Sequence, residues 1–98
     1  MKLFTVAIDR RPVVVISAIG DDVQEILDAL ENTLGEDLRS LGLWDGRLGR
    51  LQIRPARPHE ARRWHGSRRR AIEQGKHDAA DMRWLLFLVP MPLRRATP

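Results

Sequence analysis

The chain has 98 residues, of which 43% are hydrophobic and 31% are charged, and its formal net charge is +4. This length allows one domain, 1–98, with one modest core, and the composition is too apolar for an intrinsically disordered chain. No apolar run approaches the roughly 18 residues that a membrane helix needs. The absence of cysteine excludes disulfides, thiolate metal sites and cysteine nucleophiles. Charged residues 9–11 interrupt the apolar start, so we expect no signal peptide and a soluble, cytoplasmic domain.

The first elements predicted by the sequence are two strands. Residues 3–8 alternate between two faces, and residues 13–16 form a continuous β-branched run typical of a buried strand. Only residues 9–12 separate them, which leaves room for a tight reversal but supplies no glycine for it. Pro12 cannot donate to a strand ladder and is expected at the start of its strand. The pattern therefore predicts a β-hairpin.

The clearest helical pattern follows. Its apolar residues recur at the spacing of one helix face: Val23, Ile26, Leu27, Leu30 and Leu34. We expect Asp21 to cap the start of this helix and Gly35 to end it. Residues 36–41 are compatible with one more helical turn. Beyond them, Asp45-Gly46 could form a second hairpin, but we favour a loop whose Trp44 tucks into the edge of the core.

The rear half of the chain predicts a strand, a helix and a strand. Residues 51–54 form a short strand, and a helix runs from Pro58 to Gln74. Gly66 weakens the interior of that helix by about 1 kcal/mol relative to alanine. The apolar run 84–89 predicts a strand covered on both faces, or at least central in the sheet, that Pro90 and Pro92 end and that a frayed tail, 93–98, follows.

The element order β-β-α-loop-β-α-β predicts an α+β fold. We expect a single small sheet of about four strands with two helices packed on it, because a sheet must cover its apolar face with another layer.

Charge is divided unevenly along the chain. Residues 1–45 carry four basic and nine acidic side chains, whereas residues 46–98 carry thirteen basic and four acidic ones. Such asymmetry indicates a charged partner only if the two halves do not neutralise each other within the fold. If the acidic and basic helices lie side by side, the polarity cancels. If they lie apart, the molecule has a basic face.

The densest positive region is the segment 54–70. Its arginines are Arg54, Arg57, Arg62, Arg63, Arg68, Arg69 and Arg70. Fifteen of the 17 basic residues are arginine, which G+C-rich codons explain as readily as function does. Arg68 falls on the apolar stripe, so we expect its stem to lie along the rim of the core. The others could neutralise phosphates, but two phenylalanines and no tyrosine supply a poor stacking platform for single strands. We favour a surface that faces solvent or a protein.

The remaining candidate residues are weaker. The acidic cluster around residues 21–28 has the character of helix capping and an exposed helix face, without calcium-loop spacing. The three histidines lack the spacing of a helical zinc pair. His77 and Asp78, expected in a loop, could lie at the surface or orient a partner. We therefore expect no catalytic constellation, metal or cofactor. Trp44, on a glycine-flanked loop, is the best aromatic candidate for an interface.

Taken together, these patterns favour a small non-enzymatic interaction module that binds a protein partner or forms a homodimer. The residues predicted to bind the partner are Trp44, Arg62, Arg63, Arg69 and Arg70. The first alternative is a nucleic-acid-binding protein that uses the segment 54–70. The second is a small enzyme, or a subunit of one, that acts on an anionic substrate. No membrane association is expected.

Overall fold

A β-hairpin forms the centre of the protein. The structure is a computed structural model that describes residues 1–20 and 22–89, except for the side chain of Thr33. Strands β1 (Lys2–Ile8) and β2 (Arg11–Ala18) pair antiparallel, as predicted. Asp9 and Arg10 form the turn with φ of 52° and 69°, the positive values that a type I′ turn needs at both positions. The hairpin thus closes without glycine. A register shift leaves Val13 as a bulge opposite the Val6–Ala7 step.

Four antiparallel strands form a single sheet in the order β3-β1-β2-β4, which confirms the predicted α+β architecture. A 3-10 turn, η1 (Leu48–Arg50), leads into β3 (Leu51–Pro55) at one edge. The prediction that the last strand is central was wrong, because β4 (Leu85–Phe87) pairs only with β2 in the described part of the chain. Its apolar residues lack alternation because Leu85 and Leu86 line hollows on opposite faces of the sheet. Pro90, Pro92 and the predicted tail, 93–98, lie outside the described residues.

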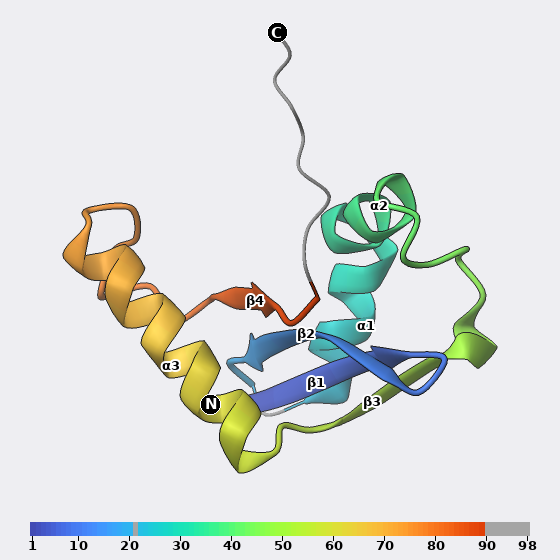
Figure 1. Cartoon of the computed structure of the whole chain (residues 1–98), viewed down its shortest axis with the longest axis horizontal. Coiled ribbons are helices and arrows are strands. Elements are labelled where there is room, and N and C mark those ends of the chain that lie inside the picture. The colour runs from blue at the N-terminus through green and yellow to red at the C-terminus, as the bar shows by residue number, and fades with distance from the viewer. Residues whose placement is uncertain (21, 90–98) are drawn as a thin grey trace, which may run out of the picture.

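Helices cover both faces of this sheet. They are α1 (Val23–Glu31), α2 (Thr33–Ser40) and α3 (Pro58–Glu73). Figure 1 shows α3 well apart from α1 and α2. The core under α1 and α2 is made of large apolar residues: Phe4, Val6, Ile8, Val14, Ile26, Leu30, Leu34, Leu38 and Trp44. Thr5 alternates with these residues along β1 and bonds Glu60 of α3 through its hydroxyl. The helices therefore lie on opposite faces. None of the described helices has the length and hydropathy of a membrane span.

The region of α1 and α2 corrects two expectations. Asp22 caps α1, since its carboxylate accepts a hydrogen bond of 2.9 Å from the Gln24 amide, whereas the predicted cap, Asp21, lies outside the described residues. Gly35 does not end a helix but lies inside α2, so three helices pack on the sheet instead of two. A Cβ at Gly35 would lie 1.8 Å from the Leu30 carbonyl oxygen and 3.3 Å from the Trp44 ring. Glycine is needed there for close packing.

Candidate functional site

The start of α3 is held to the sheet by a buried carboxylate. Glu60 is 2% exposed and accepts hydrogen bonds from the Thr5 hydroxyl at 2.9 Å and the Arg57 amide at 2.8 Å. Both of its oxygens also pair with the Arg54 guanidinium, at 2.8 and 2.9 Å. The bonds from Arg54 are the largest cause that lowers the pKa of Glu60 to about 2, against the opposing effect of burial. Arg54 is thus neutralised inside the fold.

Further along α3, two tryptophans orient the helix. Trp64 is fully buried and donates from Nε1 to the Trp84 carbonyl at 2.9 Å, and Trp84 donates from Nε1 to the Ser67 hydroxyl at 3.2 Å. Arg68 lies over the Trp64 ring and donates to the carbonyls of Ala79 and Asp81, so it is half-buried as expected. These contacts fix which side of α3 faces inward.

The outward side of α3 is basic. Arg62, Arg63, Arg69 and Arg70 are all exposed, and none of their side chains forms an ion pair or hydrogen bond with the described part of the chain. The acidic residues of the α1–α2 side are exposed on the other face of the sheet: Asp22, Glu25, Asp28, Glu31, Glu36 and Asp37. Because the sheet separates the two sets, their charges do not neutralise each other at close range.

A groove of about 450 Å³ runs along α3 beside β4. We call it the α3–β4 groove, and its lining residues are His59, Arg62, Arg63, Gly66, Ser67, Arg70 and Leu86. The helical residues recur at intervals of three and four, so they share one stripe of α3. Three of the four predicted partner-binding arginines thus come together, whereas Arg69 does not line the groove. The sequence carried a signal for this groove in Gly66, whose position inside a helix is otherwise unfavourable.

Trp44 lies apart from this groove. It is 8% exposed, packs in the core below α2, and donates from Nε1 to the Arg47 carbonyl at 3.0 Å. The predicted loop with Trp44 at the core is therefore confirmed. The predicted role of Trp44 at an interface stays a prediction, and little of the indole surface is accessible to a partner.

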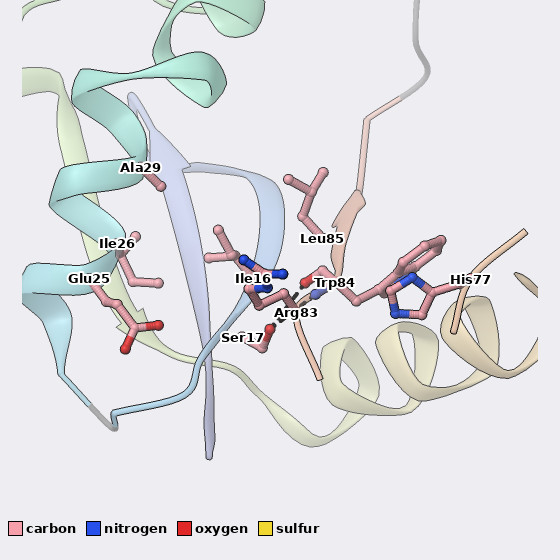
Figure 2. A pocket seen from close by; sticks show the side chains of 9 residues that line it. All are labelled: Ile16, Ser17, Glu25, Ile26, Ala29, His77, Arg83, Trp84 and Leu85. Atoms are coloured by element: carbon pink, nitrogen blue, oxygen red, sulfur yellow. Dashed lines mark hydrogen bonds between the residues drawn. The ribbon is translucent and has the colours of Figure 1, made fainter. Parts of the chain in front are cut away.

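A larger hollow of about 590 Å³ lies between α1 and the segment that leads into β4. Figure 2 shows Glu25 and Ile26 of α1 on one side of it and Trp84 and His77 on the other. The Glu25 carboxylate accepts from the amides of Ile19 at 2.8 Å and Gly20 at 2.7 Å. The Glu25 carboxylate is thus already hydrogen-bonded within the protein, and the lining of the hollow is mainly apolar.

Other polar groups of this hollow also have partners within the protein. The Ser17 hydroxyl bonds the Met82 carbonyl at 3.0 Å, and Arg83 pairs with Asp81. His77 Nε2 lies 2.9 Å from the Asp81 carbonyl oxygen. These hydrogen bonds hold the loop before β4 in place.

His77 and Asp78, the residues named for the enzyme alternative, bond different groups. The carboxylate of Asp78, the proposed neighbour of His77, accepts from the Ala80 amide instead. Within residues 1–20 and 22–89, no three histidine or acidic side chains gather in the way that a metal ion requires. In the α3–β4 groove, by contrast, three arginine side chains without a partner among the described residues lie together.

Comparison with models of protein families, with curated proteins and with solved structures finds no match to this chain, so the site rests on its own geometry.

Proposed function

We propose that this protein is a small interaction module that binds an acidic protein surface through the outward side of α3. The observation that carries the proposal is a set of exposed arginines on the face opposite the acidic helices. Their side chains form no ion pair or hydrogen bond within residues 1–20 and 22–89: Arg62, Arg63, Arg69 and Arg70. Guanidinium groups bind carboxylates through two parallel hydrogen bonds, and arginine is enriched at protein interfaces. An acidic surface would supply the ion pairs that the fold leaves unmade.

A second candidate partner is nucleic acid, since the same arginines could neutralise phosphates. A protein partner is favoured because the outward side of α3 offers no large aromatic ring for base stacking. Trp64, the only tryptophan in this helix, is fully buried. The acidic side of α1 and α2 on a second copy is one protein surface of suitable charge. The expected cytoplasmic location stays a prediction.

The direct test is a binding titration of the whole chain with a labelled polyglutamate peptide and with single- and double-stranded oligonucleotides at low salt. We expect the peptide to bind and the affinity to fall as salt rises. Reversing the charge of Arg62 and Arg69 to glutamate should abolish binding. The matched control is Arg39→Glu, which makes the same kind of charge change on the exposed surface of α2.

Three outcomes separate the candidates. Peptide binding that depends on Arg62 and Arg69 but not on Arg39 supports the proposal. Tighter binding of an oligonucleotide than of the peptide assigns the surface to nucleic acid instead. If neither probe binds and sedimentation shows a monomer at every protein concentration, the outward side of α3 is a solvated surface and the proposal fails.

A further inference from the structure

We infer that the α3–β4 groove is a binding site for a phosphomonoester group, with Gly66 at its base. We call this site the phosphate seat. This inference rests on the proposed function, because it takes the outward side of α3 as the binding surface. It adds the chemistry that the groove recognises: a phosphorylated side chain within the acidic partner.

The first argument is the absence of any structural reason for glycine at position 66. Beyond its own helix backbone, a Cβ at Gly66 would meet no heavy atom of the described residues within 4 Å, whereas one at Gly35 would collide with α1. Gly66 lies within α3 and has no positive φ, unlike Gly42 and Gly75, whose φ values are 73° and 72°. Glycine destabilises a helix interior relative to alanine, so neither packing nor backbone geometry explains this residue. The open space above it belongs to the groove and admits a ligand to the helix surface.

The second argument is the charge around that space. Arg62, Arg63 and Arg70 line the groove, and no carboxylate is among its lining residues. The Ser67 hydroxyl accepts a bond from Trp84 Nε1, which leaves its own proton to donate to a second partner. The groove thus presents donors and almost no acceptors.

A phosphomonoester matches this donor set better than a carboxylate does. It carries a charge of about −1.5 to −2 at neutral pH and three strong acceptor oxygens, enough for several guanidinium groups and a hydroxyl together. A carboxylate has two oxygens and one charge. Clusters of arginines are a recurrent mode of phosphopeptide recognition.

The test uses two labelled acidic peptides that differ only in one residue, serine or phosphoserine, and measures the ratio of their affinities for the whole chain. We expect the phosphopeptide to bind at least about tenfold more tightly, the effect of one additional charge-assisted hydrogen bond. Gly66→Gln should reduce this ratio towards one while raising the temperature of unfolding, because glutamine favours helix and fills the floor of the groove. A loss of binding caused by misfolding would lower that temperature instead.

A matched pair of arginine variants separates the groove from general electrostatics. Arg70→Gln and Arg69→Gln remove the same charge from the same exposed side of α3, but only Arg70 lines the groove. Arg70→Gln should reduce the affinity ratio of the two peptides. Arg69→Gln should weaken both peptides alike and leave the ratio unchanged. An unchanged ratio in Gly66→Gln and Arg70→Gln overturns the inference.

The same measurements distinguish failure of this inference from failure of the proposed function. If both peptides bind equally and binding depends on the α3 arginines, the protein-binding function stands and the phosphate seat falls. If neither peptide binds, the proposed function falls, and a titration with inorganic phosphate then decides the seat. A saturable shift of the Gly66 amide resonance supports a seat for a free phosphate ester, and its absence overturns the seat as well.

Discussion

Replacing Glu60 with glutamine should destabilise the protein strongly, because Glu60 joins α3 to the sheet through a buried ion pair. The Glu60 side chain is 2% exposed and that of Arg54 is 20% exposed, and their two contacts measure 2.8 and 2.9 Å. Glutamine keeps the size of the side chain and can still accept from Thr5. It removes the charge that Arg54 faces.

The magnitude follows from the pKa of Glu60, which is lowered from 4.5 to about 2, with the bonds from Arg54 as the largest cause. Such a difference between the folded and unfolded states corresponds to about 3 kcal/mol of stability at neutral pH. Removing one partner of a buried pair typically costs about 3–5 kcal/mol. Because water reaches part of the Arg54 guanidinium, we expect a loss of about 3 kcal/mol, at the lower end of that range.

Urea unfolding of the parent chain and of Glu60→Gln over a series of pH values checks this prediction. Since the folded pKa lies below the unfolded one, the stabilisation by Glu60 is complete above about pH 4.5 and is lost as the pH falls towards about 2. The difference in the free energy of unfolding between the two proteins should therefore become smaller as the pH falls over that range. The matched control is Glu73→Gln at the exposed end of the same helix. A loss below about 1 kcal/mol at neutral pH, or a gap that does not change with pH, would refute the reasoning.

Three further predictions test other parts of the structure. Gly66→Ala should raise the free energy of unfolding by about 0.8–1 kcal/mol, whereas Gly35→Ala should lower it, because only the Cβ at position 35 would collide with α1. Thermal unfolding distinguishes the two variants. If both changed the free energy of unfolding in the same direction, the packing around these glycines would be contradicted. Trp44→Ala should lower the free energy of unfolding in urea by about 3–5 kcal/mol, since Trp44 is 8% exposed and packs within the core. A loss below about 1 kcal/mol would place the indole outside the core. Asp9 has a pKa lowered mainly by its hydrogen bonds to Arg50; in an NMR titration, Arg50→Gln should return that pKa towards its ordinary value, and an unchanged pKa would exclude the contact.

Much of the fold could be predicted from the sequence, because the interactions that decide those elements lie close together along the chain. The strand alternation of residues 3–8 and the short spacing to the next strand predicted the hairpin, and the apolar spacing of residues 23–34 predicted the helix that packs on it. Pro58 similarly marked the start of α3. Local pattern did not reveal that Gly35 lies inside a helix, because its close approach to the Leu30 carbonyl and the Trp44 ring is formed only in the folded structure.

The candidate site also combines features that local sequence predicts with contacts between residues far apart in the chain. The sequence located a dense group of arginines in residues 54–70, but it could not separate Arg54, which pairs with the buried Glu60, from Arg62, Arg63 and Arg70, which line the α3–β4 groove. The wall of that groove comes from Leu86 of β4, whose place at the sheet edge is a nonlocal pairing with β2. Residues far apart in the chain meet there only after the sheet has formed.

The amino-acid sequence is enough to show that negative charge gathers in the front half of the chain and positive charge in the rear half. Whether the two charges neutralise each other depends on where the fold places the helices that carry them. Because successive side chains of a strand point to opposite faces, Phe4 and Val6 of β1 pack under α1 and α2, while Thr5 bonds α3 on the other side. The sheet therefore holds the acidic and basic helices apart, and the basic side of α3 remains exposed.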